Sequence, residues 1–160
     1  MAIGALLLFR EGNEPPSDEQ LIQRFHDKKP SYERLRDMFL ADRQVDLVAD
    51  WGIETERSVV SVKPPLPELS QARYDDYLAL LKQIGGIVVS GSREMPPEIC
   101  IYVWAAGFAG ETRHEAVCWR DQPPPDQVAS LGEIEQRSAL AGHTFVYRHV
   151  ESHWYLMRDE

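Results

Sequence analysis

Two hydrophobic periods follow one another along this chain, and their order limits the fold more than any other feature. Between residues 17 and 84, apolar side chains mostly recur at the three- and four-residue spacing of helices, with one strand-like interruption at 44–62. From residue 87 onward they form short runs separated by glycines, prolines and polar turns. Helices followed by strands in hairpins are typical of an α+β domain. We therefore expect about three helices packed on a mostly antiparallel sheet with two C-terminal hairpins.

Capping residues predict where the three helices begin and end. Ser17 lies three residues before Gln20, which is the spacing of a capping box. Pro30 is expected to end this first helix, because proline cannot donate the backbone hydrogen bond of a helix interior. The serine that follows would then begin a second helix that runs to about Ala41. The third helix is expected over residues 70–84, where a pair of glycines ends it.

Alternation and β-branched runs predict the strands. In the run ICIYVWA the aliphatic residues occupy alternate positions, and we expect their face of the sheet to pack against the helices. The other face would then carry Cys100, Tyr102 and Trp104. A short helix is expected at 131–137, and the strand 58–62 is expected to pair with 44–51. The remaining strands are expected to start at 87–89 and to span 99–105, 112–120, 144–150 and 154–157.

The first residues have two interpretations. Residues 2–9 read AIGALLLF, which is too short to span a bilayer because a helical span takes about 20 residues. The segment is either a buried first strand or the remnant of a longer anchor followed by a linker. We therefore divide the chain into a possible anchor remnant and linker at 1–16 and a single α+β domain at 17–160. An anchor would place the domain on the periplasmic side of a bacterial envelope; without one, we expect a cytoplasmic protein.

The charge of the chain restricts its partners. Acidic residues number 26 and basic residues 17, so the net charge is −9. Binding to nucleic-acid phosphates needs clustered lysine and arginine, so we expect no nucleic-acid partner. A basic protein partner fits this charge, as does simple solubility. We predict no metal or cofactor, because the ligand-like spacing of His149 and His153 falls across an expected hairpin turn.

The two cysteines lie symmetrically about a predicted turn. If the hairpin is centred on Ala109, Cys100 lies directly opposite Cys118. Directly opposed residues in a sheet are near enough for a disulfide after a small adjustment. A register slip of one residue would instead place the two side chains on opposite faces. Two reduced, buried cysteines are therefore the alternative to a disulfide.

Aromatic residues on the two hairpins predict a binding surface. Semi-exposed aromatic side chains are frequent in protein interfaces. His114 is expected opposite Trp104 on the first hairpin. The candidate surface consists of Tyr102, Trp104, His114, Trp119, Tyr147 and Trp154. For an alternative catalytic or ligand-binding site assembled from distant residues, the candidates are His114, Arg113, Glu115 and Tyr102.

Four segments of the chain follow one another in the same order as the motifs of a known family. FHDKKPSYERLRDMF is followed by ICIYVWAAGFAGETRHEAVCWRDQPPP, by VASLGEIE and by YRHVESHWYLMRDE. Together they resemble a family of small uncharacterised proteobacterial proteins that close with a YRxIxGxWYLYYE-like hairpin, and the resemblance covers most of the chain beyond residue 20. Members of that family often carry a lipoprotein signal or a membrane anchor. The resemblance implies an envelope location, and it implies no reaction and no site.

The absence of a catalytic motif favours a binding protein. We predict a non-catalytic protein-binding domain of the immunity or inhibitor type, anchored in the envelope if residues 2–9 are an anchor remnant. One alternative is a small enzyme or ligand-binding protein whose site is built from distant residues. A structural envelope protein is the other.

Overall fold

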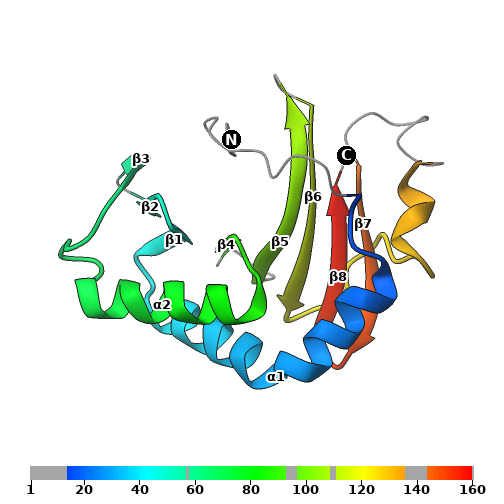
Figure 1. The fold of residues 1–160 in the computed structure, drawn as a ribbon, viewed down its shortest axis with the longest axis horizontal. Coiled ribbons are helices and arrows are strands. Elements are labelled where there is room, and N and C mark those ends of the chain that lie inside the picture. Colours follow the sequence, from blue (N-terminus) through cyan, green and yellow to red (C-terminus); the bar gives the residue numbers. More distant parts are fainter. Residues whose placement is uncertain (1–13, 57, 93–96, 109–110, 136–143, 160) are drawn as a thin grey trace.

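The computed structural model describes residues 14–56, 58–92, 97–108, 111–135 and 144–159. Its centre is one sheet of eight strands, all paired antiparallel, in the order β3-β2-β1-β4-β5-β6-β8-β7 (Figure 1). The first three strands lie in reverse chain order, β4 to β6 follow in chain order, and β7 forms the other edge outside β8. The strands are β1 (Val45–Ala49), β2 (Gly52–Thr55), β3 (Ser58–Val62), β4 (Val88–Ser92), β5 (Glu98–Phe108), β6 (Glu111–Arg120), β7 (Phe145–Glu151) and β8 (Trp154–Asp159).

Two α-helices in the described ranges, α1 (Asp18–Ala41) and α2 (Gln71–Ile84), lie on the same side of the sheet (Figure 1). A short 3₁₀ helix, η1 (Leu131–Glu133), lies beside β7 and β8. The expected α+β class, the antiparallel sheet and the two C-terminal hairpins are confirmed. The expected number of three helices is wrong, because residues 18–41 form one helix.

Pro30 lies inside α1 instead of ending it. A proline in a helix interior costs about 3 kcal/mol, and burying one large apolar side chain contributes about 1.5–3 kcal/mol. The buried stripe of α1 continues in helical register across the proline, so that one continuous helix keeps both halves of the stripe against the sheet. The fully buried members of this stripe are Leu21, Phe25, Tyr32, Leu35 and Phe39.

The predicted start of α1 and both predicted ends of α2 are present. Ser17 and Gln20 form both hydrogen bonds of a capping box at the start of α1. The Ser70 side chain accepts a hydrogen bond from the Arg73 backbone N–H at the start of α2. Gly85 ends α2 with a φ of 69°, in the left-handed region that glycine adopts without strain.

The first edge of the sheet differs from the expectation. Residues 52–55 form a strand, β2, which pairs with β1, and β3 pairs with β2 rather than with β1. A tight turn after β1 makes this possible. Gly52 has a φ of 146°, and a Cβ atom there would lie 2.8 Å from the Val62 carbonyl oxygen. Only glycine fits at the start of β2, where the backbone of β3 approaches closely, and a single residue is the only signal of this in the sequence.

The core lies between the helices and one face of the sheet. The aliphatic side chains Ile99, Ile101 and Val103 of β5 belong to it, together with the buried residues of α1 and α2. The predicted helix-facing side of β5 is therefore correct. None of the helices in the described ranges is both long and apolar enough to span a membrane. Residues 2–9, the centre of the first hairpin at Ala109 and the end of the predicted helix at 131–137 lie outside the described residues.

Two buried tyrosines in this core differ in their hydrogen bonds. The Tyr32 hydroxyl is fully buried and has no hydrogen-bond partner among the described residues, and burial raises its pKa to about 12. The Tyr74 hydroxyl donates to the Ala49 carbonyl oxygen at 2.7 Å. The two side chains therefore form a matched pair for measuring the cost of a buried hydroxyl.

We expect Tyr32→Phe to leave the free energy of unfolding unchanged or to raise it by up to about 1 kcal/mol, because it removes a buried group that lacks a partner. Tyr74→Phe should lower that free energy by about 1 kcal/mol, because it deletes a hydrogen bond. Urea unfolding at pH 7 measures both values. Equal destabilisation by the two substitutions would contradict the difference between the hydroxyls.

The raised pKa of Tyr32 also predicts an alkaline effect. The folded state keeps a proton that the unfolded state loses, so this contribution to stability is complete below pH 10 and disappears as the pH rises towards about 12. The loss amounts to about 2–3 kcal/mol. Unfolding curves between pH 9 and pH 12 should therefore decline more steeply for the wild type than for Tyr32→Phe, and parallel curves would refute the assignment.

Candidate functional site

The sheet face opposite α1 and α2 carries both cysteines and the imidazole of His114. We call it the helix-free face, since no α-helix in the described ranges packs on it. Side chains of β5, β6, β7 and β8 form one apolar cluster here, and side chains of β1 and β4 form a second one beside it. Tyr102 contacts both clusters. Their buried members are Cys100, Ala116, Cys118, Tyr147, Tyr155 and Met157 in the first, and Leu47, Ala49 and Val88 in the second.

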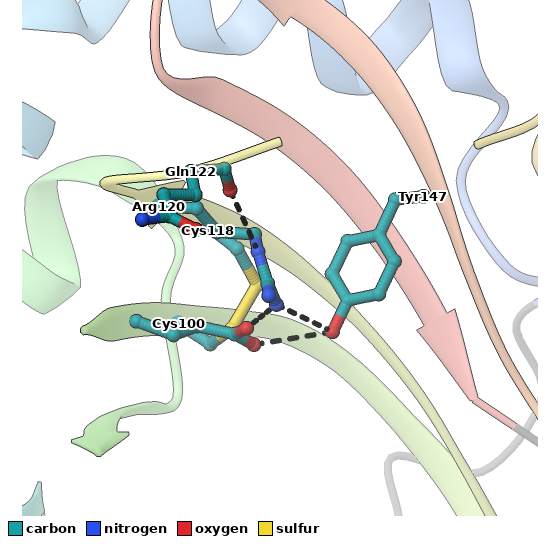
Figure 2. Close-up of a disulfide and its surroundings, with 6 residues drawn as sticks. Cys100, Cys118, Arg120, Gln122 and Tyr147 are labelled. Carbon is teal, nitrogen blue, oxygen red and sulfur yellow. Dashed lines mark hydrogen bonds and ion pairs between the residues drawn. A yellow bond between two sulfur atoms is a disulfide. The ribbon is translucent and has the colours of Figure 1, made fainter. Parts of the chain in front are cut away.

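Cys100 and Cys118 lie directly opposite each other on β5 and β6 and form a disulfide (Figure 2). Both side chains are buried. Their Cα atoms are 4.1 Å apart, and the bond closes a loop with a sequence separation of 18. This pairing of β5 with β6 has the register that was predicted from the symmetric positions of the two cysteines about the hairpin turn. The bond ties together the two strands that carry the centre of the helix-free face.

A polar network lies next to the disulfide. The Arg120 guanidinium forms an ion pair with Glu98, its cross-strand neighbour, and donates to the Tyr147 hydroxyl at 3.2 Å (Figure 2). That hydroxyl in turn donates to Glu98 at 3.2 Å, and the guanidinium lies 4.9 Å from the centre of the Tyr147 ring. Burial raises the pKa of Tyr147. The network connects β5, β6 and β7 and holds the Tyr147 ring in place.

A β-bulge at Val103 changes the register of the same hairpin. Tyr102 pairs with Ala116, but Trp104 pairs with Glu115, so β5 has one extra residue at Val103. Beyond the bulge the alternation of β5 is reversed. Trp104 therefore shares a face with Glu115 on the helix side, and the prediction that it shares a face with Cys100 and Tyr102 is wrong. His114 lies opposite Ala105, not opposite Trp104 as expected.

His114 and Asp159 form a buried pair on the helix-free face. Asp159 is the last residue of β8 and lies directly opposite His114. Its carboxylate is 2.8 and 3.1 Å from Nδ1 of the imidazole, and it also accepts the backbone N–H of His114 at 2.7 Å. The imidazole packs edge-on against the Tyr102 ring, with ring centres 5.7 Å apart. These contacts fix the orientation of His114.

A small hollow adjoins this pair. Its polar lining residues are His114 and Ser90, and the Ser90 side chain is hydrogen-bonded to the Tyr102 hydroxyl. The hollow encloses about 40 Å³. Its remaining lining comes from the apolar or aromatic side chains of Leu47, Trp51, Ile87, Val88, Tyr102 and Ala105. Residues of four strands and of the segments next to them thus line this hollow, which is mostly apolar and has the His114 imidazole in its wall.

The charged residues of the opposite face form a separate structural cluster. Glu115 is fully buried and pairs with Arg158 through the guanidinium Nε at 2.7 Å. The pKa of Glu115 is raised overall, because the effect of burial outweighs the opposing effect of the adjacent Arg158 guanidinium. Asp18 at the start of α1 accepts hydrogen bonds from Arg148 at 2.8 Å and from the Leu131 backbone N–H at 2.9 Å. These pairs connect α1 and η1 to the sheet.

The structure divides the predicted site residues between the two faces. Tyr102, His114 and Tyr147 lie on the helix-free face. Trp154 is buried in the helix-side core against Phe25, with ring centres 5.2 Å apart, and the other two tryptophans of the predicted surface, Trp104 and Trp119, also lie on the helix side. The predicted aromatic surface is therefore not one patch. The alternative catalytic set is divided in the same way, since Arg113 and Glu115 alternate with His114 along β6.

One group in the described ranges has the geometry of a possible metal site. Side-chain oxygen and sulfur atoms of Glu98, Cys100 and Cys118 lie within 4.8 Å of one another. The two sulfur atoms are bonded to each other, so they are not thiolates and cannot act as metal ligands in this state. The group therefore functions as a disulfide with a neighbouring carboxylate.

Comparisons with protein-family models, with curated proteins and with solved structures find no match for this chain. The resemblance to the proteobacterial family stays a prediction.

Loss of the disulfide is expected to destabilise the fold. Because the bond closes a loop of this length, we expect reduction or the double substitution Cys100→Ala/Cys118→Ala to lower the free energy of unfolding by about 3 kcal/mol. Urea unfolding with and without a reductant measures the effect, and the double variant is the control, since its curve should not respond to the reductant. Alkylation of two thiols in the native, unreduced protein would contradict the bond itself.

Proposed function

We propose that the protein is a non-catalytic binding domain that engages another protein through the helix-free face of its sheet. The observation that carries this proposal is the hollow beside Tyr102 and His114. It is mostly apolar, it lies on a face without a covering helix in the described ranges, and its walls come from strands of one sheet.

The size of the hollow favours a protein side chain over a small-molecule substrate or cofactor. Sites for such molecules usually enclose about 300–1,000 Å³. The hollow encloses about 40 Å³, which is enough for a few non-hydrogen atoms. Protein interfaces concentrate binding energy where one side chain enters a pocket that is closed to water. A depression of this size suits that role.

The rigidity of the surroundings also supports a preformed binding surface. The Cys100–Cys118 disulfide and the Glu98–Arg120–Tyr147 network fix β5, β6 and β7 relative to one another. The imidazole of His114 is held by Asp159. A surface that is ordered before binding loses little conformational entropy on binding, and this favours affinity.

The net charge of −9 supports a basic partner, because opposite charges accelerate encounter and disfavour wrong partners. Small acidic binding domains of bacteria include proteins that block a toxic partner, and we propose an immunity or inhibitor role of this kind. The family resemblance of the sequence supports a bacterial envelope location.

The catalytic alternative has less support. The Asp159–His114 pair has the form of an oriented general base. However, the other two charged candidates, Arg113 and Glu115, lie on the opposite face. The Ser90 hydroxyl beside the hollow is already bonded to Tyr102. A binding role for this face uses the observed contacts without requiring further residues.

Filling the hollow should abolish partner binding. Ala105→Leu adds three carbon atoms at the lining of the hollow, and Ala72→Leu adds the same atoms at an exposed position of α2 in the other layer. We expect tagged wild type and Ala72→Leu to retain one stoichiometric protein from extracts of the source cells, and Ala105→Leu to retain at least tenfold less. Thermal unfolding checks that both variants are folded. Equal retention by all three proteins, or no stoichiometric partner at all, would overturn the proposal.

A further inference from the structure

One ring nitrogen of His114 has an unused hydrogen-bonding capacity. The residue is only 8% exposed, and its Nδ1 and backbone N–H are both bonded to Asp159. No hydrogen bond from the described residues reaches Nε2. Nor is Nε2 among the polar atoms that are completely enclosed without a partner. The imidazole therefore presents Nε2 to the hollow that it lines.

The contact with Asp159 determines what Nε2 can do. A carboxylate accepts hydrogen bonds, so the proton of a neutral imidazole lies on Nδ1, where Asp159 accepts it. Nε2 then carries a lone pair and acts as an acceptor. The polar group that the hollow binds best is consequently a hydrogen-bond donor.

The lining indicates that this donor is neutral. Among the described residues, eight side chains line the hollow; six of them are apolar or aromatic, and none is a carboxylate. The Asp159 carboxylate is already engaged by His114. An ammonium or guanidinium group would lose its hydration here without direct contact with a carboxylate, which is unfavourable. A hydroxyl group loses much less and can replace its bond to water by one to Nε2.

We propose that the hollow binds a small side chain with a neutral hydroxyl donor, a serine or threonine of the partner protein, whose hydroxyl donates to Nε2 of His114. This inference rests on the proposed function and specifies the group that the partner inserts. The carbon atoms of the side chain contact Val88, Tyr102 and Ala105. The volume of about 40 Å³ suits a side chain of this size.

A pair of small probes of equal shape tests the chemistry without the partner. Propan-2-ol can donate a hydrogen bond, whereas acetone has nearly the same shape and can only accept one. We expect propan-2-ol to cause saturable NMR shifts of the backbone amides of Val88 and Ala105 at pH 8, with about 5- to 10-fold tighter binding than acetone. The ¹⁵N resonance of His114 Nε2 should move with propan-2-ol and not with acetone.

Two variants identify the acceptor. His114→Phe keeps a ring in the wall and removes both nitrogens, so it should abolish the preference for propan-2-ol. Ser90→Ala removes the other polar side chain of the hollow and should retain the preference. If His114→Phe does not fold, the Nε2 resonance of the wild type decides the question. Equal binding of the two probes, absence of saturable shifts, or an unchanged preference in His114→Phe would overturn the inference.

The outcomes separate this inference from the proposed function. If Ala105→Leu loses the partner while the probes show no preference, the hollow is a protein-binding site that does not select a donor, and the inference is wrong while the function stands. If the probes show the preference and Ala105→Leu retains the partner, the chemistry of the hollow is correct and its role in partner binding is wrong.

Discussion

The pairing of β5 with β6 determines which side chains lie on each face of the sheet. In its first part, the ladder places Cys100 opposite Cys118 and turns both towards the helix-free face. The extra residue at Val103 then reverses the alternation of β5, so that Trp104 turns to the helix side and Ala105 comes to lie opposite His114. A small alanine at that position leaves the space that becomes the hollow. Without the bulge, a tryptophan would lie beside the imidazole.

The helix layer depends on a second constraint, the burial of one continuous stripe along α1. Local signals predicted the capped start of α1 and both ends of α2 correctly, because capping depends on residues three or four positions apart. Local reasoning failed at Pro30, because the penalty of a proline is local and the gain from burying Tyr32, Leu35 and Phe39 comes from the distant sheet. The count of three helices was wrong for this reason.

The sequence predicted only part of the candidate site. The symmetric positions of Cys100 and Cys118 indicated the cross-strand register, because a hairpin relates its two strands through its centre. The bulge has no comparable signal, and the faces assigned to Trp104 and to the partner of His114 were wrong as a consequence. Asp159 was missed because its contact with His114 spans 45 residues and depends on β8 pairing with β6. Ser90 and Trp51 were missed because β1 and β4 are brought to the site by the order of strands in the sheet.

Cross-strand NOEs between backbone protons of β5 and β6 test the central claim most directly, because they report the register on both sides of the bulge. The structure predicts contacts of Tyr102 with Ala116 and of His114 with Ala105. Contacts between His114 and Trp104 would show an unbulged hairpin with the tryptophan on the helix-free face, and this result would contradict both the hollow and the binding surface built around it.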